Sequence, residues 1–180
     1  MNRAAFLDRD GVINRKALEG KYVTRWEEMQ ILPGVAEAIS LLNQAGFRVI
    51  VVSNQRCVAK GLITIGELED LHQKMCGALA KDRATIDAVY YCPHEKQPPC
   101  RCRKPQPGML LDAARDHDIE LAASWMIGDS GADVEAGRTA GCKTALLGSS
   151  VSTDSGADAT APSLLEVARR ILQFEQEMAG

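Results

Sequence analysis

Two aspartates near the start of the chain have the type and spacing needed for chemistry on a phosphate group. Asp8 and Asp10 directly follow the apolar run 4–7, within the stretch FLDRDGVIN at residues 6–14. Because successive residues of a strand point to opposite faces, both carboxylates share one face and emerge together at the end of the strand. Carboxylate oxygens are suitable ligands for Mg²⁺, and a carboxylate can also attack phosphorus as a nucleophile.

Three more polar clusters follow short apolar runs: Ser53 with Asn54 and Gln55, Arg103 with Lys104, and Asp129 with Ser130 and Asp133. Ligands of an open parallel sheet bind outside the carboxyl ends of its strands, so these clusters should meet at one edge. Mg²⁺ could be held there by Asp8, Asp10 and Asp129. The phosphoryl oxygens would contact Ser53, Asn54 and Lys104. Asp10 would protonate the leaving alkoxide and later activate water.

The elements that must position these residues follow from the hydrophobic pattern. Nearly continuous apolar runs predict buried parallel strands at 4–7, 47–52, 88–91, 125–127 and 143–147. Amphipathic stretches predict helices at 35–44, from 64 to about 80, at 109–116, at 133–140, and from 163 onward. The connection 148–162 carries little packing signal. This alternation predicts one three-layer αβα domain over residues 1–180, with a Rossmann-like parallel central sheet.

In this order, the motifs DxDGV, SN, Lys and GDxxxD resemble those of the haloacid dehalogenase (HAD) superfamily of phosphohydrolases. The resemblance implies that Asp8 is the nucleophile and Asp10 the general acid and base, whose backbone carbonyl also binds the metal. It further implies that Ser53 and Lys104 hold the phosphate and that Asp129 binds Mg²⁺. Asp133 either caps the following helix or orients Lys104. The alternative is that these aspartates are solvated turn residues and Lys104 a surface charge.

A second metal site is predicted in the stretch CPHEKQPPCRC, residues 92–102. Its four candidate ligands are Cys92, His94, Cys100 and Cys102, and three thiolates with one imidazole would close a tetrahedral structural zinc site. The alternatives are free thiols or a disulfide to Cys92, which a reducing compartment disfavours. Because Cys102 leads directly into Arg103 and Lys104, a bound zinc would also fix the lysine.

Composition limits the class of ligand. The 180 residues carry a net charge of −3 and 46% apolar side chains, so no general basic field would attract nucleic acid or a membrane. A small molecule is therefore the expected ligand. The first residues contain no apolar signal core, which predicts a cytoplasmic location. With 4% aromatic residues and no long apolar stripe, a monomer is expected.

The segments between the motifs are used by core helices and strands, so we expect no cap domain and an open pocket made of loops. The combination DRDGVIN, YV…LPGV, CxH…CxCRKPxPGM and GDxxxD is similar to the family of D-glycero-D-manno-heptose 1,7-bisphosphate phosphatases, from residue 6 to about 141. That similarity implies removal of the 7-phosphate during synthesis of a nucleotide-activated heptose, a lipopolysaccharide precursor. Histidinol-phosphate phosphatase domains share much of this pattern.

A sugar bisphosphate needs contacts beyond the scissile phosphate. Arg56 and Arg103 are suitable phosphate donors beside Asn54, Gln55 and Lys104. Lys16, Glu19 and Tyr22 are candidates for the sugar, with exposed loop side chains, or packing for Tyr22, as the alternative.

Two departures from the family pattern bear on specificity. The corresponding loop in the family commonly reads NQSGxxRG, and this chain has Arg56 and Cys57 in place of its Ser-Gly pair. A lysine often follows the GD pair in the family, and this chain has Ser130 there. One positive contact near the phosphate is therefore missing, or replaced by Arg56. Other hypotheses are a histidinol-phosphate or other small-molecule phosphatase, and a catalytically silent, zinc-stabilised binding module. Nucleic-acid binding by a zinc finger is ranked last, because the ligand spacing leaves no recognition helix.

Overall fold

Six parallel strands form the centre of the computed structural model, which describes residues 1–148 and 156–179. The strand order is β3-β2-β1-β4-β5-β6. The strands are β1 (Arg3–Leu7), β2 (Phe47–Asn54), β3 (Ala88–Cys92), β4 (Trp125–Gly128), β5 (Lys143–Leu147) and β6 (Ala159–Ala161). Chain order reverses between β1 and β4, and a ligand site is expected at such a switch point.

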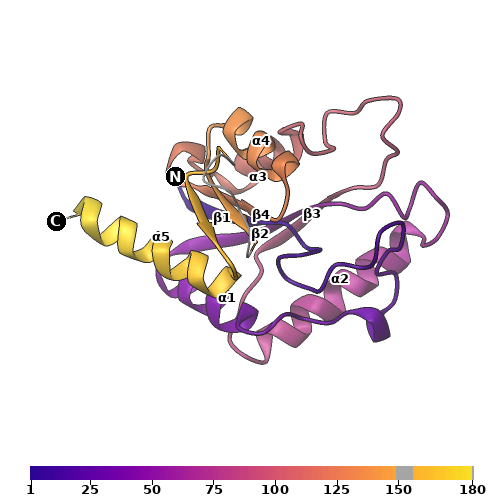
Figure 1. Cartoon of the computed structure of the whole chain (residues 1–180), viewed down its shortest axis with the longest axis horizontal. Coiled ribbons are helices and arrows are strands. Elements are labelled where there is room, and N and C mark those ends of the chain that lie inside the picture. Colours follow the sequence, from indigo (N-terminus) through magenta and orange to yellow (C-terminus); the bar gives the residue numbers. More distant parts are fainter. Residues whose placement is uncertain (149–155, 180) are drawn as a thin grey trace.

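Helices cover both faces of this sheet (Figure 1). α1 (Val35–Gln44), α2 (Ile65–Ala80) and α5 (Leu164–Ala179) pack on one face, and α3 (Gly108–His117) with α4 (Gly131–Ala140) on the other. Two short 3-10 helices, η1 (Trp26–Glu28) and η2 (Leu121–Ala123), lie in the connections. The predicted three-layer αβα architecture is confirmed. Among the described residues, no helix has the length and apolar character needed to cross a membrane.

Alternation along β1 builds both halves of the core. Ala5 and Leu7 belong to the cluster beneath α1, α2 and α5, whereas Ala4 and Phe6 belong to the cluster beneath α3 and α4. All four side chains are fully buried. A strand buried on both faces needs this continuous apolar run, and its end is the point where the chain can first turn polar. Asp8 occupies that point.

The predicted strands and α-helices agree with the observed ones, and β6 and the two short 3-10 helices are additions. The connection 148–162, expected to carry little packing, contains β6, which pairs with β5. Asp158 fixes this strand, because its Oδ2 accepts hydrogen bonds from the backbone nitrogen (2.7 Å) and the hydroxyl (2.9 Å) of Thr144. Three small residues, Ala-Thr-Ala, gave no hydrophobic run to detect. The part of this connection at 149–155 lies outside the described residues.

Neighbouring leucines on α3 allow the core to be tested. Leu110 lies on the face of α3 that packs against the sheet and is fully buried, whereas Leu111 is 43% exposed. We expect Leu110→Ala to lower the free energy of unfolding by about 2–5 kcal/mol, because it leaves a cavity. Leu111→Ala should cost less than about 1 kcal/mol. Urea denaturation of both variants measures the difference, and equal losses would contradict the assigned packing of α3.

Candidate active site

The polar clusters predicted to meet do so in one cavity of about 470 Å³ at the carboxyl edge of the sheet. This volume lies within the range of small-molecule sites. The loop after β1 forms one wall, and the loop that follows β3 forms another. Its lining includes Asp8, Asp10, Lys16, Glu19, Tyr22, Asn54, Arg103, Lys104, Asp129, Ser130 and Asp133.

A buried lysine lies between two carboxylates at the base of this cavity. The Nζ of Lys104 lies 2.9 Å from Asp8 Oδ1 and 2.6 Å from Asp133 Oδ1, and it donates to the carbonyl of Val52 at 2.7 Å. Burial alone would lower the pKa of Lys104, but Asp8 and Asp133 outweigh it and hold the pKa above its ordinary value. Burial raises the pKa of Asp8 to about 6. The charge of Lys104 opposes this rise, and the charge of Asp133 adds to it.

Asn54 and Asp133 position this lysine. Asn54 accepts from the backbone nitrogen of Lys104 and donates to its carbonyl, both at 3.0 Å, so the end of β2 grips the loop that carries the lysine. Asp133 performs both roles considered for it. Its Oδ1 holds Lys104, while its Oδ2 accepts from the nitrogen and hydroxyl of Ser130 at the start of α4.

Asp10 is surrounded by donors. Arg9 and Asn14 each donate to its carboxylate at 3.0 Å, and Gln55 donates at 2.9 Å. Burial alone would raise the pKa of Asp10, but the charge of Arg9 and these hydrogen bonds lower it overall. Asp10 is therefore ionised and fixed in direction before a ligand arrives.

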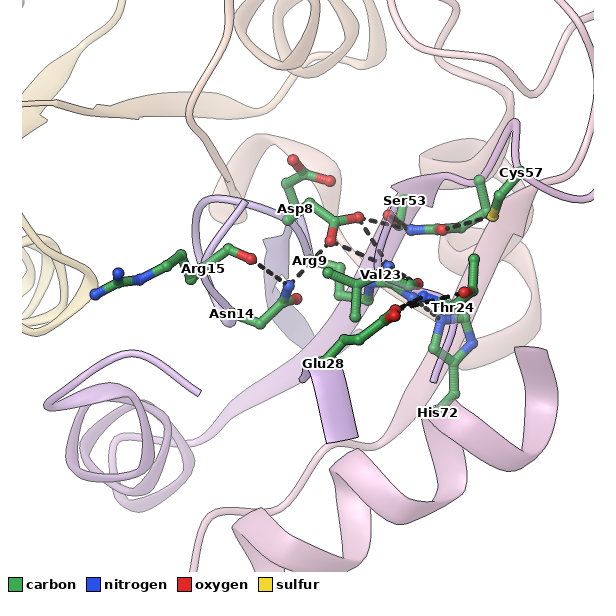
Figure 2. A network of polar contacts seen from close by, with 12 residues as sticks. Asp8, Arg9, Asn14, Arg15, Val23, Thr24, Glu28, Ser53, Cys57 and His72 are labelled. Atoms are coloured by element: carbon green, nitrogen blue, oxygen red, sulfur yellow. Dashed lines mark hydrogen bonds and ion pairs between the residues drawn. The ribbon is translucent and has the colours of Figure 1, made fainter. Parts of the chain in front are cut away.

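Sequence reasoning missed the buried partners Arg9, Asn14 and His72. Figure 2 shows His72 reaching from α2 toward Arg9, and the His72 Nε2 lies 3.2 Å from the Arg9 Nη1. Burial and the charge of Arg9 lower the pKa of His72 to about 3, so the neutral ring can accept this hydrogen bond. The helical spacing of Leu71, His72 and Met75, all buried, was the available signal.

Two glycines allow the close approach of the carboxylates. Gly11 has φ +94°, and a Cβ built there would lie 2.2 Å from Asp129 Oδ2. At Gly128, a Cβ would lie 2.1 Å from the Cβ of Asp133. Any side chain at either position would displace an aspartate of the site.

The carboxylates at the cavity base fit a hard divalent cation. Asp8, Asp129 and Asp133 each offer an oxygen, and these atoms lie within 4.8 Å of one another. The ammonium of Lys16 lies 2.7 Å from Asp129 Oδ2, so this oxygen already has a cationic partner. Because Lys104 and Ser130 use Asp133, its role here is to hold the lysine, and Asp8 and Asp129 are the better ligands.

The four residues of the predicted zinc cluster converge. Cys92 Sγ lies 3.5 Å from Cys100 Sγ and 3.2 Å from Cys102 Sγ, and His94 Nδ1 lies 3.2 Å from Cys102 Sγ. These distances are too long for a disulfide, and all three cysteines are free, so the disulfide alternative is wrong for this structure. Three sulfurs and one nitrogen around a point form a donor set suited to zinc.

Three predicted contact residues lie next to cavity-lining residues without lining the cavity themselves. Ser53, Gln55 and Arg56 are absent from the lining found among the described residues. Ser53 and Gln55 are buried and hydrogen-bonded to each other at 2.8 Å. Gln55 therefore orients Asp10, and the guanidinium of Arg56 instead pairs with Glu95 at 2.6 Å. In this structure Arg56 is thus paired with Glu95, and it does not line the cavity beside Ser130.

Comparisons with known proteins agree with this architecture. The HAD-hydrolase-like family model matches residues 101–172. The crystal structure of a D,D-heptose 1,7-bisphosphate phosphatase from B. bronchiseptica, complexed with magnesium and phosphate, superposes with a TM-score of 0.85 at 36% identity. The alignment covers 96% of this chain and 99% of that one. Fold and site thus define a HAD-like hydrolase.

Curated relatives narrow this class. The D-glycero-beta-D-manno-heptose-1,7-bisphosphate 7-phosphatase of Rhodopseudomonas palustris is 42% identical over 145 residues, 77% of this chain and 79% of its own. The D-glycero-alpha-D-manno-heptose-1,7-bisphosphate 7-phosphatase of Mycobacterium bovis is 39% identical over 169 residues, 91% and 88% of the two chains. The chain therefore belongs to the heptose-1,7-bisphosphate 7-phosphatase family of HAD-like hydrolases and is a phosphoric monoester hydrolase.

Burial disfavours the ionised form of Asp8, so we expect Asp8→Asn to stabilise the protein in a pH-dependent way. The folded-state pKa of about 6 lies above the ordinary 3.8, so the folded protein takes up the proton first as pH falls. Ionised Asp8 is therefore destabilising above pH 6, and the amide removes that cost. Without added magnesium, Asp8→Asn should raise the free energy of unfolding by on the order of 1 kcal/mol at pH 8, and by almost nothing near pH 4.

Chemical denaturation across this pH range measures the effect. Asp70→Asn is the control, because Asp70 is exposed and lies on α2, away from the cavity lining. It should follow the wild-type pH profile. A less stable Asp8→Asn protein at pH 8 would show that attraction to Lys104 outweighs burial.

Proposed function

We propose that this phosphatase depends on magnesium and removes the 7-phosphate of a D-glycero-D-manno-heptose 1,7-bisphosphate through an aspartyl-phosphate. The observation that carries the proposal is the buried Asp8–Lys104–Asp133 cluster beside the donor-fixed Asp10, at the base of one cavity. The product would serve the synthesis of a nucleotide-activated heptose.

Asp8 is the proposed nucleophile. Its Oδ1 accepts from Lys104, so Oδ2 is the oxygen that can face a bound phosphate. Attack by Oδ2 forms the bond to phosphorus while the bond to the sugar oxygen breaks. As the carboxylate loses its charge to the new bond, Lys104 can shift its hydrogen bond toward a phosphoryl oxygen.

Asp8, Asp129 and the backbone carbonyl of Asp10 would hold the magnesium. The bound ion would supply positive charge to the phosphoryl oxygens as they pass through the transition state. Gly11 lets Asp129 approach Asp8 closely enough for this shared role.

Asp10 would move the protons. Its lowered pKa suits the second step, in which the carboxylate removes a proton from water attacking the aspartyl-phosphate. In the first step it must carry a proton for the leaving sugar oxygen. A bound phosphate beside it is a like charge that raises its pKa, so substrate binding itself prepares the acid form.

The names of the relatives support the heptose substrate, and the cavity supports a second anionic group. Lys96 and Arg103 line the cavity from the loop after β3, and Glu19 and Tyr22 line it from the loop after β1. A bisphosphate could place its scissile phosphate at Asp8 and its other phosphate near these two cations.

Turnover of a substrate panel tests the proposal. Phosphate release with magnesium should be fastest from one anomer of the heptose 1,7-bisphosphate, and slower from histidinol phosphate and fructose 1,6-bisphosphate. Asp8→Asn should lower kcat by at least about 10³-fold, because it removes the nucleophile. Preference for histidinol phosphate would overturn the substrate assignment. Unchanged hydrolysis by Asp8→Asn would overturn the nucleophile.

A zinc ion held by Cys92, His94, Cys100 and Cys102 would fix the loop that carries Lys104. We expect zinc removal to lower kcat by about tenfold in a protein that stays folded, because Lys104 loses its support. Cys100→Ser should act similarly, whereas Cys76→Ser, on α2 outside the cluster, should retain wild-type turnover. Circular dichroism and metal analysis confirm the folded, zinc-free state. Full turnover in that state would contradict the role of the loop.

A further inference from the structure

An exposed lysine on the loop after β1 contacts the carboxylate at the start of the fourth motif. Lys16 Nζ lies 2.7 Å from Asp129 Oδ2, although the two residues are 113 positions apart in the chain. The lysine side chain is 59% exposed, and the aspartate side chain is 17% exposed. Both residues line the cavity that contains Asp8.

The pairing itself contributes little to stability, since exposed ion pairs have a small net effect. Its location is the informative part. Ser130, next to Asp129, offers no cation, and Arg56 is held by Glu95 outside the cavity lining. Among the described residues, Lys16 is the cation that the structure pairs with Asp129.

Lys16 changes the net charge of the group of ionisable side chains around Asp8. Asp8, Asp129 and Asp133 bring three negative charges, and Lys104 brings one buried positive charge. With a divalent cation, this group is neutral without Lys16 and positive with it. The positive charge of Lys16 therefore strengthens the attraction of an anion, which Lys96 and Arg103 in the cavity lining also favour.

We propose that Lys16 is a phosphate-binding residue, which pairs with Asp129 in the ligand-free protein and transfers to an oxygen of the phosphate group when magnesium and substrate bind. This inference rests on the proposed function. A lysine is suited to the transfer, because its ammonium is a point charge on a flexible four-carbon stem. The ion that binds Asp129 competes for the same oxygen and so releases the lysine.

Replacing Lys16 by alanine should change the affinities for magnesium and for phosphate in opposite directions. In Lys16→Ala, magnesium should bind about two- to fivefold more tightly, because its competitor at Asp129 is gone. Inorganic phosphate should bind the magnesium-saturated protein about tenfold or more weakly, because a charge-assisted hydrogen bond is lost. With the heptose bisphosphate, KM should rise more than kcat falls.

Calorimetric titration of magnesium, and then of inorganic phosphate, measures both constants without turnover. Lys16→Arg keeps the charge and should stay near the wild type. Arg15→Ala is the matched control, since Arg15 is an exposed neighbouring cation that does not belong to the cavity lining and points away from the polar network in Figure 2. It should change each constant by less than about twofold.

Two outcomes separate the proposals. Unchanged phosphate affinity in Lys16→Ala, or an equal loss in Arg15→Ala, would overturn the role of Lys16 while the phosphatase assignment stands. A wild-type protein that binds no phosphate in the presence of magnesium would overturn the proposed function, and this inference with it.

Discussion

The buried ammonium of Lys104 holds together two carboxylates that would otherwise repel each other. It lies within 2.9 Å of Asp8 and 2.6 Å of Asp133, and removing the lysine would leave two buried carboxylates without a compensating charge. The three residues come from the end of β1, the loop after β3 and the start of α4. The sheet order, the grip of Asn54 and the glycines at 11 and 128 all serve to bring these segments to one point.

The part of the site nearest to the strand ends could be predicted from sequence. Apolar runs located the strands, and the residue after each run had to lie at the carboxyl edge. That geometry depends on the backbone alone, which is why Asp8, Asn54 and Asp129 meet in the cavity as expected. The helices followed from their apolar spacing in the same way, and α2 begins with a capping box formed by Thr64 and Glu67.

The rest of the site could not be predicted, because it depends on where long side chains point. A local sequence pattern does not determine that direction. Arg56 had a suitable type and position for phosphate, but Glu95 holds its guanidinium. Gln55 was expected to contact substrate, and its amide donates to Asp10 in this structure. Arg9 also donates to Asp10, and His72 on α2 contacts Arg9. β6 escaped detection for a related reason, since its three small residues gain a structure only through pairing with β5 and contact between Thr144 and Asp158.

The separation of these contacts along the chain has a consequence for folding. Asp8 and Lys104 are 96 positions apart, and Lys16 and Asp129 are 113 apart. Contacts of such high sequence separation close long loops, and they are entropically the most expensive to form. The cavity that contains Asp8 therefore exists only after β1, β2 and β4 lie side by side. A ligand bound there recognises the completed sheet and shifts the whole unfolding equilibrium, so that occupancy of the site and survival of the fold are thermodynamically linked.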